Sequence, residues 1–166
     1  AYEMLRSLVR SEMCIRDRYA HGNEPSHHVI HLYNYVNRPW RTQELVDSVY
    51  RSQYANSVDG LSGNEDCGQM SAWYVLNSMG FYQVCPGKPV YSIGRPVFDK
   101  AVINLPEDKT FSIIVKNNSK KNKYIESISL NGESLNTPFF NHQDIANGGT
   151  MEINMSDKPN NKTLIP

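Results

Sequence analysis

The sequence contains no long hydrophobic run. None of its apolar stretches approaches the roughly 20 residues that a helix needs to cross a bilayer. It also has no excess of charge, because 17 Lys and Arg residues balance 17 Asp and Glu residues. Without a basic surplus there is no electrostatic attraction to nucleic acid or to an anionic membrane surface. The sequence therefore predicts a protein with no nucleic-acid partner and no membrane insertion.

Cysteine is scarce, with three residues in the whole chain. Cys14 lies in an N-terminal segment that is set aside below, which leaves Cys67 and Cys85. These two are 85 − 67 = 18 positions apart, on either side of a predicted helix. A disulfide would require the chain to turn back sharply, and two reduced thiols fit the sequence equally well.

The first eighteen residues differ from the rest of the chain. Arginine crowds them, yet no long apolar segment with a small-residue cleavage site follows, so they do not form a secretory signal. The string from Ser11 to Arg18 looks like a translated sequencing-adapter read, and we interpret residues 1–18 as an artefact outside the fold. The predicted organisation is then a helical part at 19–82, a β unit at 83–160 and a tail at 161–166.

An acidic loop leads directly into an apolar segment. Glu65 and Asp66 are bracketed by glycines, and the residues that follow, Gln69–Met79, are apolar almost all round. This pattern predicts a buried helix that ends at Gly80. Asp66 would sit at or just before its N-terminus, where backbone N–H groups and the helix dipole favour an ionised carboxylate that acts as a base or a ligand. The alternative is that Asp66 only caps the helix.

A polar segment around Pro25 holds a second group of candidate ligands. Pro25 disfavours helix at the preceding residue, so Asn23 and Glu24 belong to a loop with a helix starting just after it. Glu24, His27 and His31 have spacings found in transition-metal sites. Only one such motif is present and Pro25 interrupts the helix that it needs, so this interpretation is disfavoured.

Further segments complete the helical part and begin the β unit. Thr42 is suited to cap an amphipathic helix that runs to about Tyr54. Beyond Gly80 the hydrophobic period changes, and short β-branched or aromatic segments alternate with Gly, Pro and Asn. The predicted strands are Val90–Ile93, Phe98–Leu105, Thr110–Lys116, Tyr124–Leu130 and Met151–Met155.

Turn residues indicate how these segments connect. Asn131-Gly132 is the dipeptide that best fits a type I′ hairpin turn. Pro96 and Pro106 bracket the strand at 98–105 and indicate that it is short or lies at a sheet edge, because proline has no N–H to donate. Helices followed by strands predict an α+β fold with an antiparallel β unit. The polar loops at 21–28 and 57–69 should share one end of the helices.

Several ordered motifs resemble a single family. They are Gly22–His28, Arg38-Pro39-Trp40, Asp59–Tyr74, Gly80-Phe81-Tyr82 and Val84–Gly87. Together they resemble the C-terminal part of glycoside hydrolase family 92, the calcium-dependent exo-acting α-mannosidases. The resemblance runs from about His21 to about Asn160 and extends into the strands, at Leu130-Asn131-Gly132 and Gly148-Gly149-Thr150.

The resemblance implies a longer protein with an N-terminal β-sandwich and an (α/α)6 catalytic toroid. This chain would hold the closing helices of the (α/α)6 toroid followed by the antiparallel β unit, and its missing N-terminal part would be a partner. The implied activity is inverting hydrolysis of α-1,2-linked mannose in N-glycans or mannans. The implied location is periplasmic or secreted.

The resemblance also assigns catalytic roles in the acidic loop. Asp66 matches the position of the general base, with Glu65 beside it. Asn64 stands where many family members have a further Asp that supports the base, and an Asn side chain can still accept a hydrogen bond. The general acid is expected upstream of this sequence, so the isolated chain is predicted to be inactive.

Binding roles follow from the same resemblance. A Ca²⁺ ion is implied near Glu24, with Asn23 contributing, because a hard cation takes carboxylate and carbonyl oxygens. His27, His28 and Gln69 are candidate substrate-binding residues, with packing or helix-start hydrogen bonds as their plainer explanation.

Two other classes of function fit parts of the sequence. A carbohydrate-binding or adhesion module without catalysis would account for ten Tyr, two Trp and the β unit. It gives no reason for acidic loops at the starts of helices. A purely structural role would make the acidic residues caps, and Asp66→Ala would then cost only about 1 kcal/mol of stability.

Overall fold

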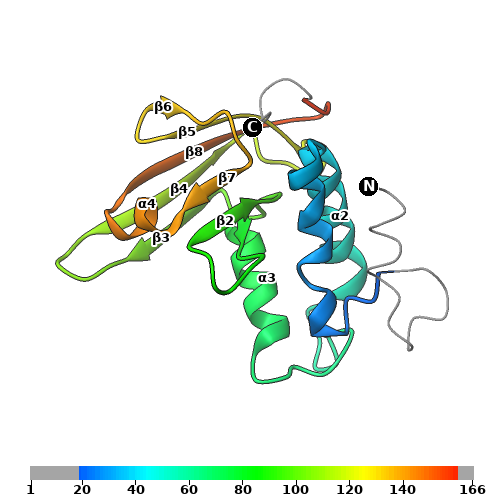
Figure 1. Ribbon diagram of the computed structural model, residues 1–166. Coiled ribbons are helices and arrows are strands. Elements are labelled where there is room, and N and C mark those ends of the chain that lie inside the picture. The colour runs from blue at the N-terminus through cyan, green and yellow to red at the C-terminus, as the bar shows by residue number, and fades with distance from the viewer. Residues whose placement is uncertain (1–18, 161–166) are drawn as a thin grey trace.

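The structure is a computed structural model that describes residues 19–160, with helices beside two sheets (Figure 1). The α+β class is confirmed. The helical elements are the 3₁₀ helices η1 (Glu24–Ser26) and η2 (Val29–Val36) and the α-helices α2 (Pro39–Gln53) and α3 (Gln69–Met79). No helix in this part of the chain is long and apolar enough to cross a membrane. The predicted artefact at 1–18 and the tail at 161–166 lie outside the described residues.

Helix α3 has the predicted bounds. It ends at Gly80, which adopts a left-handed conformation with φ of 103° and donates its N–H to the last turn. Glycine suits this position because it has no Cβ to clash there. The indole of Trp73 is fully buried in the core of the helical part. Its buried neighbours are Ile30, Val46, Val49 and Tyr82.

Helix α2 begins earlier than predicted, at Pro39 instead of Thr42. Proline is tolerated in a first helical turn, where its missing N–H would have no partner in the helix. Thr42 does not cap the helix. Its side chain is buried, and its hydroxyl donates to the Ile30 carbonyl at 2.9 Å, which ties α2 to η2. The sequence also predicted that Glu24 lies in a loop, but Glu24 is the first residue of η1.

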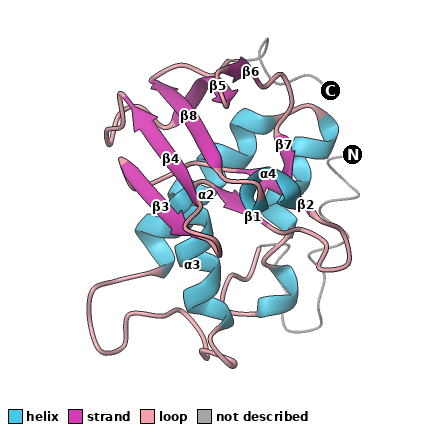
Figure 2. Ribbon diagram, turned by 90° about the vertical axis from the view of Figure 1, so that its left-hand side faces the viewer, coloured by secondary structure: helices cyan, strands magenta, loops and turns pink. Residues whose placement is uncertain are grey.

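The strands form two sheets (Figure 2). The smaller sheet has the order β1-β2-β7, with strands at Phe81–Tyr82, Val90–Ile93 and Phe139–Asn141. The larger sheet has the order β3-β4-β8-β5-β6, with strands at Lys100–Asn104, Thr110–Lys116, Gly149–Ser156, Tyr124–Leu130 and Glu133–Ser134. A short helix, α4 (His142–Ala146), precedes β8.

Most of the predicted strands are confirmed, and one pairing differs. β2, β4 and β5 have the predicted bounds, and β3 lies at the edge of its sheet. Asn131 and Gly132 have φ of 52° and 86° and join β5 to β6, as a type I′ turn requires. β4 and β8 pair in parallel, so the larger sheet is mixed and not wholly antiparallel. The first strand begins at Phe81, two residues before the predicted start of the β unit.

A second hydrophobic core lies between the two sheets. Alternate residues of β4 and β8 are buried, as the period of two predicts. They pack against side chains of the smaller sheet and of α4. The cluster contains Phe81, Ile93, Phe111, Ile113, Val115, Ile125, Ile128, Phe140, Ile145, Met151, Ile153 and Met155.

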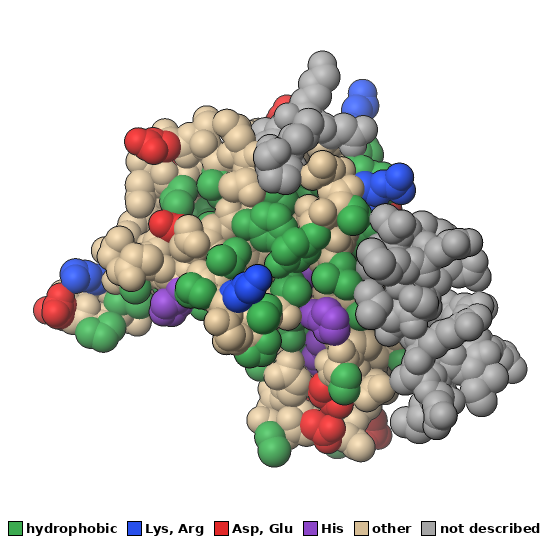
Figure 3. Space-filling view, viewed as in Figure 1, with side chains coloured by type: hydrophobic (Ala, Val, Ile, Leu, Met, Phe, Trp, Pro, Cys, Tyr) green, Lys and Arg blue, Asp and Glu red, His purple; other side chains and the backbone are tan. Residues whose placement is uncertain are grey.

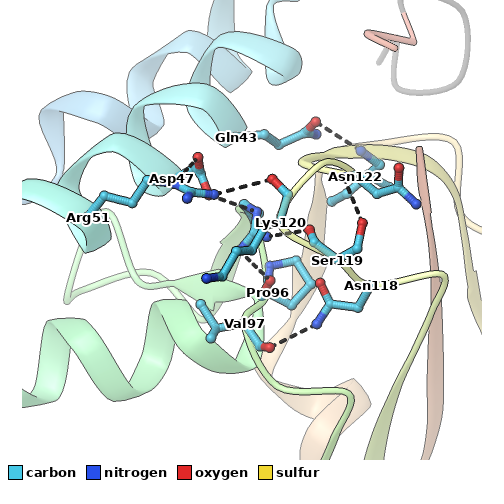
Figure 4. Close-up of polar contacts among 11 residues, drawn as sticks. Gln43, Asp47, Arg51, Pro96, Val97, Asn118, Ser119, Lys120 and Asn122 are labelled. Carbon is cyan, nitrogen blue, oxygen red and sulfur yellow. Dashed lines mark hydrogen bonds and ion pairs between the residues drawn. The ribbon is translucent and has the colours of Figure 1, made fainter. Parts of the chain in front are cut away.

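An ionic cluster joins α2 to the β unit (Figure 4). Oδ1 of Asp47 forms an ion pair with Nε of the buried Arg95 at 3.2 Å. The Asp47 carboxylate also accepts two hydrogen bonds from the half-exposed Arg51. Arg95 also donates to the Ser119 carbonyl, and Arg51 donates to that of Lys120. Because these carbonyls belong to the loop between β4 and β5, the cluster fixes the helical part against the larger sheet.

His31 links three elements of the helical part and the smaller sheet. Its ring is fully buried in η2, and Nε2 donates to Oδ1 of Asn77 in α3 at 2.9 Å. The other nitrogen, Nδ1, accepts from the Ser92 hydroxyl of β2 at 3.2 Å. Burial lowers the pKa of His31 from 6.5 to about 4. The folded protein therefore holds this ring neutral.

This burial predicts a loss of stability in acid. The unfolded chain takes up a proton on His31 as pH falls through 6.5, whereas the folded chain does so only near pH 4. Between pH 7 and pH 5 the free energy of unfolding should fall by about 2 kcal/mol on this account. Urea unfolding at both pH values measures it, and the loss should be smaller by that amount in His31→Gln. Equal losses in the two proteins would contradict the assignment.

Candidate active site

Two glycines allow the polar loops to touch. A Cβ atom on Gly22 would lie 2.6 Å from the carbonyl oxygen of Ser62, and one on Gly63 would lie 2.4 Å from that of Gly22. No side chain fits at such distances, so only glycine permits this approach. The loops therefore meet at one end of the helices, as predicted. In Figure 3, Asp and Glu side chains gather at the lower end of the helical part.

The contact between the loops brings two carboxyl groups together. Glu24 is half-buried, whereas Asp66 is exposed and adopts a left-handed conformation with φ of 41°. A hydrogen bond with Glu24, and then the charge of Glu24, raise the pKa of Asp66. The Oε1 atom of Glu24 is buried and has no hydrogen-bond partner among residues 19–160. Two such groups in contact favour a shared proton or a bound cation, because two adjacent negative charges repel.

Asp66 does not cap α3. The N-cap residue is Gly68, which has no side chain with which to cap the helix. Instead, Glu65 reaches over the first turn and its Oε1 atom accepts from the backbone N–H of Ser71 at 3.1 Å. The capping role that the sequence left open for Asp66 therefore belongs to Glu65. Asn64 is exposed and makes no side-chain hydrogen bond within the described structure.

His27 and Gln69 form one network behind the carboxylates. The carbonyl of His21 can only accept, so His27 donates from Nε2 at 2.9 Å. Burial lowers the pKa of His27, and the neutral ring then accepts at Nδ1 from the Gln69 amide at 3.3 Å. The same amide nitrogen donates to the Tyr82 hydroxyl at 3.1 Å. His28 is half-buried and has no side-chain hydrogen bond in the described part of the chain.

The donor atoms discriminate between classes of metal. Both ring nitrogens of His27 and of His31 already have protein partners, so the transition-metal site considered from the spacing with Glu24 is not formed. Residues 19–160 contain no group of three or more His, Cys, Asp or Glu suited to hold a metal. What remains is an oxygen-only set, the carboxylates of Glu24 and Asp66 next to Asn23. Such a set fits a hard cation, and it supplies fewer than the six to eight oxygens that Ca²⁺ prefers.

A cavity of about 480 Å³ lies beside the acidic loop, between the end of α2 and α3. Its walls combine three tyrosine rings with aliphatic and small polar side chains, and neither carboxylate of the pair contributes to it. The lining residues are Tyr50, Tyr54, Ala55, Asn56, Ser57, Val58, Gly60, Leu61, Ser71, Tyr74 and Val75.

Cys67 and Cys85 are both free and exposed in the structure. Of the two possibilities that the sequence left open, a disulfide or two reduced thiols, the structure has the two thiols.

A comparison with known families decides what kind of site this is. Residues 3–157 match the glycosyl hydrolase family 92 catalytic domain. The chain belongs to glycosyl hydrolase family 92. The match begins within residues 1–18, whose interpretation as an artefact stays a prediction.

Solved family 92 structures resemble this chain closely. A family 92 α-mannosidase of Bacteroides thetaiotaomicron, solved in complex with mannoimidazole, is 39% identical with a TM-score of 0.84. The match covers 89% of this chain and 20% of that enzyme. A family 92 inverting mannosidase of Bacteroides thetaiotaomicron VPI-5482 is 37% identical with a TM-score of 0.83, over 93% of this chain and 21% of its own.

A curated relative is also named as a glycosidase. An uncharacterised secreted glycosidase of Arthroderma benhamiae is 32% identical over 156 residues. The match covers 88% of this chain and 20% of the relative. The family 92 chain described here therefore spans about a fifth of the length of the relatives that it matches.

Sequence reasoning missed one residue of this family 92 site. The ring of His21 is buried and connects the two loops through Tyr19 and Tyr54. Its only signal in the sequence was its place beside Gly22, in a polar segment where other histidines attracted attention. No periodic pattern marks a residue whose partner Tyr54 is 33 positions away.

Proposed function

We propose that this family 92 chain is the C-terminal part of the catalytic domain of an inverting exo-α-mannosidase, with Asp66 as the general base. The observation that carries the proposal is the pairing of Glu24 with Asp66 at the end of the helices. Inverting hydrolysis needs an acid and a base roughly 6.5–9.5 Å apart, so that a water molecule fits between them. Two carboxyl groups in contact cannot serve as that pair. The general acid is therefore assigned to the missing N-terminal part.

Asp66 has the properties that a base requires. Its side chain is exposed, so an attacking water can reach it. When no cation is bound, Glu24 raises the pKa of Asp66, so its carboxylate then binds a proton more strongly than an ordinary aspartate. Glu65 is engaged with the first turn of α3, and Asn64 remains available beside Asp66 to orient the water.

Glu24 is assigned to a Ca²⁺ ion, with Asn23 contributing. The support is the buried Oε1 atom of Glu24, which has no partner in residues 19–160, in a set of oxygen donors without thiolate. Bound Ca²⁺ would supply positive charge that polarises sugar hydroxyls. Glu24 itself would hold its carboxylate at the contact between the two loops, and the remaining oxygens would come from the rest of the enzyme.

The proposed substrate is a terminal α-1,2-linked mannose of N-glycans or mannans. Gln69 and His28 are assigned to hold the sugar, and the buried His27, whose two ring nitrogens already have protein partners, is assigned to support Gln69 through their hydrogen bond. The proposed location is periplasmic or secreted, which the secreted relative of Arthroderma benhamiae supports. Residues 19–82 would close the (α/α)6 toroid and residues 83–160 would form the β unit behind it.

The proposal is tested on the full-length enzyme of which this chain is a part. It should hydrolyse α-1,2-mannobiose and release mannose first as the β-anomer, which proton NMR detects in the first minutes. The 166-residue chain alone should be inactive, because the acid and base each contribute on the order of 10²- to 10⁴-fold. Release of the α-anomer, or hydrolysis by the chain alone, would contradict the proposal. Binding of mannosides without hydrolysis would favour a binding module.

Removal of the Glu24 carboxylate should weaken calcium dependence and substrate binding together. In full-length Glu24→Ala, the Ca²⁺ concentration for half-maximal activity should rise at least tenfold, because one charge-bearing ligand is lost. KM should rise in parallel. Activity titrated with Ca²⁺ after chelation measures both, with Glu133→Ala, an exposed carboxylate of β6, as the control. Calorimetry on the chain alone should show only weak binding, and micromolar affinity there would mean that the site is already complete.

A further inference from the structure

His21 lies in a hydrogen-bonded chain whose direction is fixed. The carbonyl of Met70 can only accept, so the hydroxyl of Tyr54 donates to it, at 2.9 Å. The Tyr54 oxygen must then accept from Nε2–H of His21, at 2.7 Å. The ring is buried, and with its proton on Nε2 the neutral form accepts at Nδ1 from the hydroxyl of Tyr19 at 2.8 Å.

The same ring is held firmly by its neighbours. The ring is 2% exposed and stacks on His27 with ring centroids 4.6 Å apart. It also makes a T-shaped contact with Trp73, with ring centroids 4.3 Å apart. The backbone carbonyl of His21 accepts from the His27 ring, and the Trp73 indole donates to the His27 carbonyl at 3.2 Å. These hydrogen bonds therefore link the two ends of segment 21–27 to each other and link the segment to α3.

Both ends of this network lie next to the paired carboxylates. Glu24 is inside segment 21–27. Asp66 precedes Met70 by four residues, and the Met70 N–H donates to the carbonyl of Glu65, in the loop that carries Asp66. Two carboxylates in contact repel each other. The loops that carry them therefore need a fixed connection, and the hydrogen bonds from His21 through Tyr54 to Met70 provide a direct one.

We propose that His21 is a positioning residue. It fixes the position of the Glu24 loop relative to the Asp66 loop through the hydrogen bonds that link Tyr19, His21, Tyr54 and Met70. The inference rests on the proposed function, since what is positioned is the proposed base. His21 does not touch the substrate in this role. It acts through Tyr54 on the first turn of α3.

A role in packing alone makes different predictions from a positioning role. His21→Phe keeps an aromatic ring in the cluster and loses both side-chain hydrogen bonds. His21→Asn keeps an acceptor near the position of Nδ1 and loses the donor to Tyr54. Tyr54→Phe removes the acceptor and the bond to Met70. The matched control is Tyr50→Phe, which removes a hydroxyl one turn earlier in α2 from a ring packed on the same Trp73.

In the full-length enzyme, His21→Phe and Tyr54→Phe should lower kcat roughly a hundredfold, because small displacements of a catalytic group have effects of this size. KM should change by less than about threefold, and Tyr50→Phe should leave both constants within about twofold of the unmodified enzyme. His21→Asn should resemble His21→Phe, because it too lacks the donor to Tyr54. If packing alone mattered, His21→Phe would keep kcat.

A second measurement needs no activity. In the full-length enzyme with selectively labelled histidine, imidazole ¹⁵N shifts should show His21 as the neutral tautomer protonated at Nε2. The carboxyl ¹³C resonances of Glu24 and Asp66 should move in His21→Phe and stay in place in Tyr50→Phe. A full-length enzyme without α-mannosidase activity would end the proposed function, and these resonances would still decide the positioning role.

The proposal is overturned by a proton on Nδ1, by unmoved carboxyl resonances in His21→Phe, or by a kcat unchanged in that variant. If His21→Phe fails to fold, Tyr19→Phe decides the question. It removes only the hydroxyl that donates to Nδ1, so the ring is free to turn or to change tautomer. A tenfold or greater loss of kcat with normal thermal stability would then support the role of His21, and full activity would exclude it.

Discussion

The full-length enzyme with Asp66→Ala is expected to lose at least a hundredfold in kcat while its fold stays intact. General acid–base catalysis contributes on the order of 10²- to 10⁴-fold, and Asp66 is proposed to act only on the attacking water. Because that interaction is made in the transition state, KM should change little. Initial rates on α-1,2-mannobiose measure the loss, and circular dichroism checks the fold.

The control for this experiment is Asp59→Ala, an exposed carboxylate in the loop that precedes the acidic motif. It should leave kcat unchanged within about twofold, because it lies outside the paired carboxylates. Near-normal turnover in Asp66→Ala would make the base assignment wrong. A large loss in Asp59→Ala as well would indicate a disturbed loop and not a missing base.

Stability separates the catalytic explanation from the capping explanation. Glu65, not Asp66, accepts from the first turn of α3. Asp66→Asn, which keeps a side chain that tolerates the left-handed conformation of this residue, should therefore change the free energy of unfolding by no more than about 0.5 kcal/mol. Glu65→Ala should cost about 1 kcal/mol, the usual cost of a lost cap. Loss of the Asp66 carboxylate should thus affect kcat, whereas loss of the Glu65 carboxylate should affect the free energy of unfolding.

The sequence predicted elements that are long and strongly periodic. Helix α3 and strand β4 have the predicted bounds, because their burial follows one regular period. Strand β5 also has the predicted bounds, although a register shift between Ile125 and Ser127 interrupts its alternation. β1, β6 and β7 have two or three residues each, too few to show any period. The start of α2 was misplaced for a different reason. Thr42 has the chemistry of a cap, but a tertiary hydrogen bond to Ile30 takes its hydroxyl.

The site was predicted in its parts and not in its arrangement. The resemblance to family 92 supplied Glu24 and Asp66 as separate ligand and base. Their contact depends on the close approach of Gly22 to Ser62 and Gly63, which no local pattern encodes. Sequence reasoning placed helix capping and base chemistry as rivals at Asp66, and the structure assigns capping to Glu65 next to it. Such a division between neighbours depends on backbone conformation, which the sequence leaves open here.

The other large effect expected concerns stability, at the contact between α2 and the β unit. Asp47→Ala should lower the free energy of unfolding by about 3–5 kcal/mol, because it leaves the guanidinium of Arg95 buried without its counter-charge. Arg95 is 6% exposed, and desolvation already lowers its pKa against the opposing effect of Asp47. Urea unfolding of the chain, followed by tryptophan fluorescence, measures the loss.

Two matched variants show whether burial causes this effect. Arg51 also pairs with Asp47, but its side chain is 50% exposed, so Arg51→Ala should cost less than about 1 kcal/mol. Removal of both buried charges in Asp47→Leu with Arg95→Met should restore much of the stability lost in Asp47→Ala, since no unpaired charge then remains. If the double variant were as unstable as Asp47→Ala, the unpaired charge of Arg95 would not be the cause of the loss.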